Sequence, residues 1–85
     1  MTWFWMSFAD PKRPKGQQFL GVAIVEADEF LHAVSISHRL GINPGGEIAG
    51  YVLPQPPPAG MQHRLLTKAE AEAYVEDDPR SKKDA

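Results

Sequence analysis

The segment Phe19-Leu-Gly-Val-Ala-Ile-Val25 and the residues that follow it decide the fold of this chain. This run is apolar, of strand length and rich in β-branched residues, so it predicts a strand. A helix is expected over residues 29–40, where apolar residues recur at helical spacing after Asp28, a potential N-cap. Residues 41–46 then predict a helix end and a tight turn, and residues 47–53 predict a strand that runs back.

The end of this helix is predicted in more detail. Gly41 is expected to be the left-handed C′ residue, with Ile42 packing back on Ile36 as in a Schellman motif. The apolar stripe that should face the core consists of Phe30, Ala33, Val34 and Leu40.

The aromatic segment Trp3-Phe-Trp-Met-Ser-Phe8 predicts a further strand with two bulky faces. We expect it to form a hairpin with the strand at 19–25, with Trp3 or Trp5 over Gly21 and Ala23. The main helix would then cover the other, larger face of that second strand. Two interpretations of the tryptophan face remain: a central strand covered on both sides, or an open aromatic surface used for binding.

The C-terminal part of the chain contains weaker signals. Residues 54–60 predict a proline-rich connection, residues 62–66 a short strand, and residues 68–76 a weakly docked helix. Thr67 and Glu70 match a capping box at the start of that helix. We therefore expect one α+β domain over residues 1–78, followed by a flexible charged tail over 79–85. Its antiparallel-dominated sheet would have three or four strands in the order β-β-α-β-(β)-α, with one main helix packed on one face.

Composition excludes several classes of protein. The chain has 85 residues, a formal net charge of −2 and no cysteine, which rules out disulfides and thiolate metal sites. No apolar run approaches the roughly 20 residues of a membrane helix, and we expect a cytoplasmic protein. The slight acidity argues against a dedicated nucleic-acid binder, in which a clustered basic surface is expected.

The side chains that could carry chemistry are poorly placed for it. His32 and His38 lie six residues apart on the predicted helix, about 120° around its axis, so they cannot chelate one ion as an i, i+4 pair would. Ser35 and His38 could touch, but no Gly-x-Ser-x-Gly elbow is present. We expect no enzymatic activity, no metal and no cofactor.

The leading hypothesis is a non-catalytic protein-binding module that recruits or blocks another protein, as small accessory proteins of phages or mobile elements often do. It rests on an aromatic face that a small core leaves uncovered, and it includes a homodimer formed through this face or a strand edge. The expected partner-binding residues are Trp3, Trp5, Lys12, Arg13 and Lys15.

Two alternatives belong to other functional classes. One is a small-molecule binding domain that uses the aromatic face together with Asn43, Glu47 and Tyr51. The other is a weak nucleic-acid binder that uses the basic loop at Lys12–Lys15. The net acidity makes the nucleic-acid binder the less favoured of the two.

Overall fold

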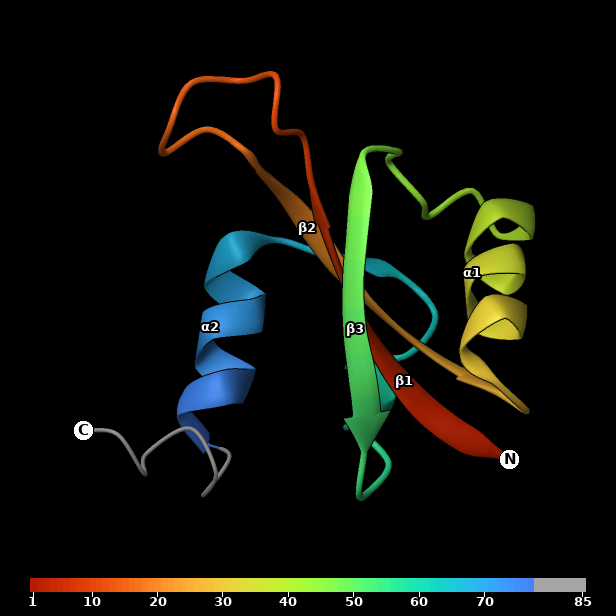
Figure 1. Cartoon of the computed structure of the whole chain (residues 1–85). Coiled ribbons are helices and arrows are strands. Elements are labelled where there is room, and N and C mark those ends of the chain that lie inside the picture. Colours follow the sequence, from red (N-terminus) through yellow and green to blue (C-terminus); the bar gives the residue numbers. More distant parts are fainter. Residues whose placement is uncertain (78–85) are drawn as a thin grey trace.

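A computed structural model describes residues 1–77 of the chain as an α+β domain with one antiparallel sheet, as the sequence predicts. The order along the chain is β1 (Thr2–Ala9), β2 (Phe19–Ala27), α1 (Phe30–Arg39), β3 (Glu47–Leu53), the 3-10 turn η1 (Ala59–Met61), β4 (Leu65–Leu66) and α2 (Lys68–Asp77). The strand order in the sheet is β3-β1-β2-β4, so β1 is central and β3 is an edge (Figure 1). The expected charged tail at 79–85 lies outside the described residues.

The β1–β2 hairpin forms as predicted, but its register differs from the expected one. Trp5 lies opposite Ile24, whereas Met6 lies opposite Ala23 and Phe8 opposite Gly21. The expectation that a tryptophan covers Gly21 and Ala23 is therefore wrong, because the pairing is shifted by one residue and this reverses the faces. A β carbon on Gly21 would instead meet the side chain of Leu65, so it is β4 that approaches this glycine.

An irregularity in β2 explains part of this shift. Phe8 pairs with Gly21 and Ala9 with Phe19, which leaves Leu20 as the extra residue of a β-bulge. Gly21 has a φ of +143°, a backbone conformation that favours glycine. Beyond the bulge the alternation is reversed: Leu20 packs against the cluster under α1, while Phe19 lies on the face of Trp5 and Ser7.

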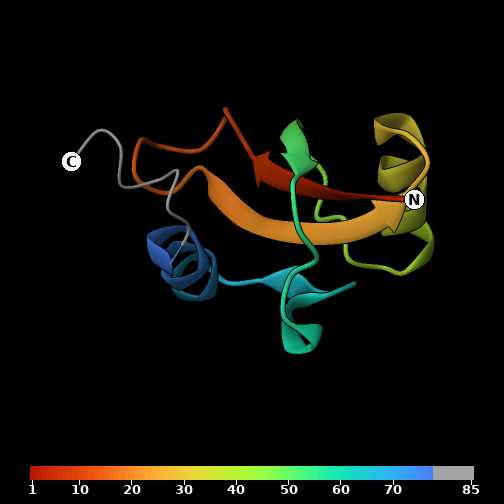
Figure 2. The same ribbon diagram turned by 90° about the horizontal axis from the view of Figure 1, so that it is seen from below.

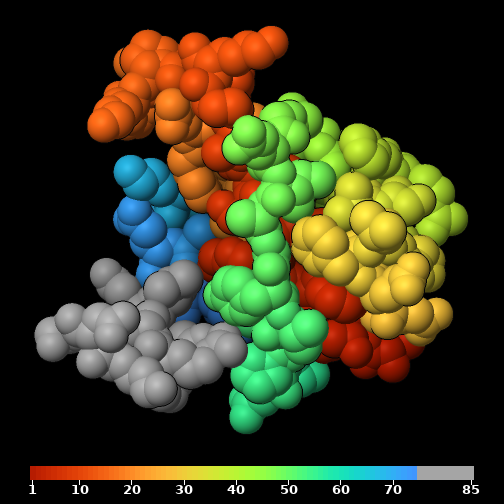
Figure 3. Space-filling model, viewed as in Figure 1, coloured from red at the N-terminus to blue at the C-terminus, as the bar shows by residue number. Residues whose placement is uncertain are grey.

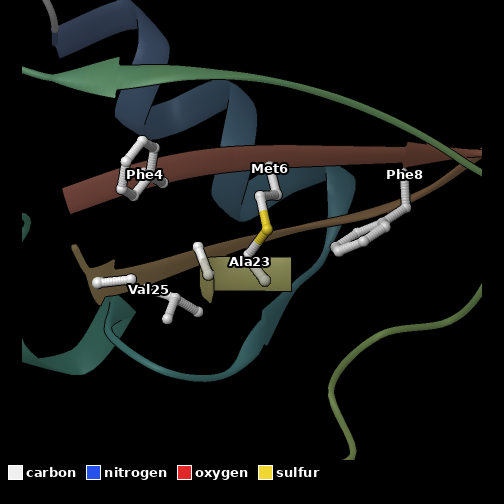
Figure 4. Packing of buried hydrophobic residues seen from close by; sticks show 7 residues of the cluster. Phe4, Met6, Phe8, Ala23 and Val25 are labelled. Carbon is white, nitrogen blue, oxygen red and sulfur yellow. The ribbon is translucent and has the colours of Figure 1, made fainter. Parts of the chain in front are cut away.

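Helix α1 covers the face of the sheet that carries Phe4, Met6 and Phe8 of β1, side chains that Figure 4 shows together with Ala23 and Val25 of β2. On β2 it packs against small and medium side chains, Ala23 and Val25, and not against the larger face as expected. All five are buried, with exposed fractions of 0–6%. The bulk that fills this layer therefore comes from β1, and the small residues of β2 make room for the helix.

The two ends of α1 differ in how well the sequence predicts them. Asp28 is not the N-cap as expected: the strand continues to Ala27, and the cap is Glu29, which makes no side-chain capping bond. At the other end, Ile42 N–H donates to the Ser37 carbonyl at 3.0 Å and Gly41 N–H to the His38 carbonyl at 3.1 Å. These two bonds, with Gly41 at φ +72°, are the predicted Schellman motif.

The stripe of α1 that faces the core also differs from the expected one at its C-terminal end. Ala33 is fully buried, and Phe30 and Val34 are partly buried against the core. Leu40, which was expected to join them, is 49% exposed because it is the C-cap and lies beyond the last helical turn. Ser37 is fully buried instead, and its hydroxyl donates to the Val34 carbonyl at 2.6 Å.

Helix α2 covers the opposite face of the sheet, so the strands lie between two helical layers (Figures 1 and 2). Its predicted capping box is present: Glu70 N–H donates to Thr67 Oγ1 at 3.2 Å, and Thr67 N–H donates to Glu70 Oε1 at 3.0 Å. Leu66 before the cap and Ala71 after it share the same buried cluster, as in a hydrophobic staple. This local motif fixes the helix on the sheet although its apolar stripe is weak.

An ion pair reinforces the same junction between β4 and α2. The Arg64 guanidinium binds both carboxylate oxygens of Glu70, and its Nε donates to the Gly60 carbonyl at 2.6 Å. The hydrogen bond from Arg64 and that from the Thr67 backbone lower the pKa of Glu70 from 4.5 to about 2. The carboxylate is therefore charged whenever it caps the helix at neutral pH.

Candidate functional site

The aromatic face of β1 is covered where the leading hypothesis needs it to be open. Trp5 is 7% exposed, and its ring stacks with those of Tyr51 and Tyr74, with centroid separations of 5.9 and 5.6 Å. Tyr74 comes from α2, so the second helix supplies the cover that the small core was expected to lack. With α2 in place, Trp5 has little surface to offer a partner.

Trp3 is the more accessible of the two tryptophans. It is partly buried, and its ring lies 5.4 Å from that of His63 in a tilted arrangement. It also lines a shallow hollow of mixed polar and apolar character, with Glu26 and Gln55, at the start of β1. Trp3 and Trp5 thus differ in accessibility, although their side chains lie on the same face of β1.

The basic loop between β1 and β2 is exposed and makes several hydrogen bonds within itself. Asp10 N–H donates to the Gln18 carbonyl at 2.8 Å, and Gln17 N–H to the Pro14 carbonyl at 3.0 Å. Lys12 and Lys15 are exposed, and Arg13 forms an ion pair with Asp10, with 3.5 Å between Arg13 Nε and Asp10 Oδ2. The loop projects beyond the end of the sheet (Figure 1), which separates it from Trp3 by about six strand residues, roughly 20 Å. The predicted partner-binding residues therefore do not form one surface.

Asn43, Glu47 and Tyr51 do not converge on one ligand either. The Asn43 side chain accepts a hydrogen bond from Gly45 N–H at 2.8 Å, donates to Ser37 Oγ at 3.0 Å and lies 3.3 Å from His38 Nε2. It therefore holds the turn between α1 and β3. Glu47 and Tyr51 share one face of β3, but they lie four positions apart along the strand, roughly 13 Å.

The outer edge of β3 is an unpaired sheet edge in the described part of the chain. β3 pairs with β1 on one side only, and none of residues 1–77 forms a strand on its other side. Its exposed residues include Tyr51 and Val52, at 45% and 53%, and Figure 3 shows the strand at the surface beside α1. In an antiparallel strand, alternate residues direct their N–H and C=O groups away from the paired neighbour. Three or four of the seven residues therefore present unpaired backbone groups.

This edge lacks the usual features that prevent strand addition. Natural edge strands are often protected by lysine, by proline, by a bulge or by being short. Within Glu47–Leu53 the register to β1 is regular, the single charge is Glu47 at the start, and proline first occurs at Pro54. Gly50 needs no side chain because the Phe30 ring lies over it: a β carbon there would come within 2.5 Å of that ring.

A pocket of about 360 Å³ lies on the other side of the sheet, between α2 and the β1–β2 hairpin. Its walls are Trp5, Val22 and Ala71, which are buried, together with Phe19, which is 37% exposed. Ser7, Lys68 and Glu72 add polar groups to it. Sequence reasoning missed this pocket because Phe19 reaches this face only through the bulge at Leu20.

Residues 1–77 contain no group of three or more histidine, aspartate or glutamate side chains placed to hold a metal ion. Within the same part of the chain, neither helix has the length and apolar character of a membrane span. Comparisons with protein-family models, with curated proteins and with solved structures gave no match.

Proposed function

We propose that this chain is a non-catalytic protein-binding module that takes a strand of its partner onto the outer edge of β3. The observation that carries the proposal is a seven-residue edge strand with unpaired backbone groups and no protecting lysine, proline or bulge. Strand addition draws its affinity from main-chain hydrogen bonds and its specificity from alternate side chains. Here those side chains are Ile48 and Val52 on the α1 face and Ala49 and Tyr51 on the other.

This proposal keeps the binding role expected from the sequence and moves its site. Trp5 supports the site from behind, because its ring stacks under Tyr51. The basic loop takes no part in the proposed contact, since it projects from the far end of β1.

A selection of displayed random peptides against the wild-type chain tests the proposal. We expect the recovered sequences to be extended, rich in β-branched and aromatic residues, and to shift the backbone NMR signals of β3. They should bind the Val52→Lys variant at least about tenfold more weakly, because lysine on an edge strand opposes pairing. The matched control is Leu31→Lys, which places the same charge on α1 at a residue that is 74% exposed. Peptides that bind both variants equally well, and shift signals outside β3, would contradict the proposal.

The pocket beneath α2 favours a second candidate function, the binding of a small apolar molecule. Its volume lies within the range of ligand sites, and its aromatic walls with a few polar groups match their usual composition. The test is NMR titration with single-ring aromatic fragments. We expect shifts at Trp5 and Val22 that Phe19→Ser weakens and Leu40→Ser does not, since Leu40 is a similarly exposed apolar residue outside the pocket. Equal weakening by both variants would count against this site.

A further inference from the structure

We infer that the strand added to β3 is β3 of a second copy of this chain, paired antiparallel about a two-fold axis at Gly50. The inference rests on the proposed function and names the partner. It is carried by the sequence of the edge itself, Glu-Ile-Ala-Gly-Tyr-Val-Leu, which has Gly50 at its centre.

The geometry of a sheet restricts how two copies of β3 can pair. A closed dimer brings the same surface of both copies together, so each residue that contacts a second residue is contacted by it in return. Side chains alternate between the two faces along a strand, and directly opposed side chains lie on the same face. Each residue of β3 must therefore lie opposite a residue of the second copy whose number differs from its own by an even number. Centring the pair on Gly50 uses all seven residues, whereas centring it on Ala49 or Tyr51 leaves only five within the strand.

The Gly50 register also matches side chains by size and character. On the α1 face Ile48 would oppose Val52 of the second copy, a β-branched pair of the kind that stabilises antiparallel sheets. On the other face Ala49 would oppose Tyr51, a small residue beside a large one. Glu47, the single charged residue of the strand, would face Leu53 and not its own copy, so the pairing sets no like charges opposite each other.

The centre of the contact suits a close approach of two backbones. Gly50 has no side chain, and the Phe30 ring already covers it on the α1 side. The two Phe30 rings, which are partly exposed in the single chain, would flank the axis. The product is one continuous sheet of eight strands with the two short β4 strands at its ends, and the two open β3 edges are removed.

Cysteine cross-linking tests the register, because the chain has no cysteine of its own. We expect an equimolar mixture of Ile48→Cys and Val52→Cys chains to form a disulfide-linked dimer under mild oxidation. Each variant alone should form several-fold less, since Ile48 and Val52 oppose each other only across the two copies. Cross-linking of Val52→Cys alone that equals the mixture would overturn the Gly50 register.

Solution mass over a concentration series tests the dimer itself. We expect the wild type to approach twice its 9.4 kDa chain mass as concentration rises. Val52→Lys should dissociate at least about tenfold more readily, while Leu31→Lys should behave as the wild type. Circular dichroism spectra that match the wild type would show that both variants are folded. A wild type that stays monomeric up to millimolar concentration overturns the dimer. If selected peptides still bind β3 in that case, the proposed function survives. If no peptide binds β3, the proposed function fails as well.

Discussion

The two strands that flank β1 meet the surrounding solvent in different ways. On one side, the outer edge of β2 is covered: β4 pairs with Val22 and Ala23, and His63 N–H donates to the Ile24 carbonyl at 2.9 Å. On the other side, β3 is of similar length and has no such cover among the described residues. The chain thus uses residues 63–66 to cover the middle of one edge of its sheet, at residues 22–24, and leaves the opposite edge without a paired strand among the described residues.

Because of this difference, we expect substitutions at the two edges to have different effects, on folding at one edge and on association at the other. The cover on β2 is anchored by buried apolar side chains and a capped helix, so changes there should unfold the chain. The β3 edge is exposed, so changes to its outer side chains should alter association and leave folding almost intact.

Leu66→Ala should remove the anchor of the covered edge. Leu66 is 1% exposed and packs in the cluster under α2, so its truncation should lower the free energy of unfolding by about 3 kcal/mol. Urea denaturation followed by tryptophan fluorescence measures the effect. Leu40→Ala is the matched control, because Leu40 is 49% exposed and should cost well below about 1 kcal/mol. Similar losses in the two variants would show that the β4 cover is not a structural anchor.

Gly50→Ala should disturb the way β3 is held on the sheet. The new β carbon would lie about 2.5 Å from the Phe30 ring and 2.6 Å from the Trp5 carbonyl oxygen, which is backbone and cannot easily move. We expect a loss of about 2–3 kcal/mol in the free energy of unfolding, measured in urea. Gly60→Ala, where nothing lies within 4 Å, should change it by less than about 0.5 kcal/mol. If Gly50→Ala were as well tolerated as Gly60→Ala, the close contact of Phe30 with β3 would be disproved.

Glu70→Gln should make the stability of the α2 junction less dependent on pH. The pKa of Glu70 is lowered to about 2 in the folded chain, so the carboxylate stabilises the fold above its ordinary pKa of 4.5. That contribution is lost as the pH falls from about 4.5 towards 2. We expect the wild type to unfold at higher urea than Glu70→Gln at pH 7, with a difference that shrinks across this acidic range. A difference that stays constant from pH 7 to pH 2 would contradict the assigned ion pair with Arg64.

Val52→Lys should have the smallest effect on folding, in contrast to its effect on association. The Val52 side chain is 53% exposed at the open edge, so at low protein concentration the free energy of unfolding should change by less than about 0.5 kcal/mol. Urea denaturation of dilute samples measures this. A loss comparable to that of Leu66→Ala would mean that Val52 belongs to the core of the single chain.

The features that the sequence predicts correctly depend on neighbouring residues. The Schellman end at Gly41 and the capping box of Thr67 and Glu70 are each set by a few consecutive positions, and both form with the expected bonds. The order of strands and helices follows from similar local patterns.

The features that sequence reasoning missed depend on residues far apart in the chain. The bulge at Leu20 reverses the faces of β2, and its position is fixed by the pairing of Phe8 with Gly21. The cover of Trp5 comes from Tyr74, about seventy residues later, on a helix whose alanine-rich stripe gives little sign of where it docks. The open edge follows from the strand order β3-β1-β2-β4, which no local pattern determines.

Amide hydrogen exchange of β3 over a concentration series tests the central claim most directly. In dilute samples we expect alternate amides of β3 to exchange quickly, while those of β1 and of Ala23 in β2 are protected by their ladders. As concentration rises, the fast amides of β3 should become protected and those of the β4 edge should not change. Fast β3 amides that stay unprotected at every concentration, or that are already protected in the most dilute sample, would contradict an open edge that closes on a second copy.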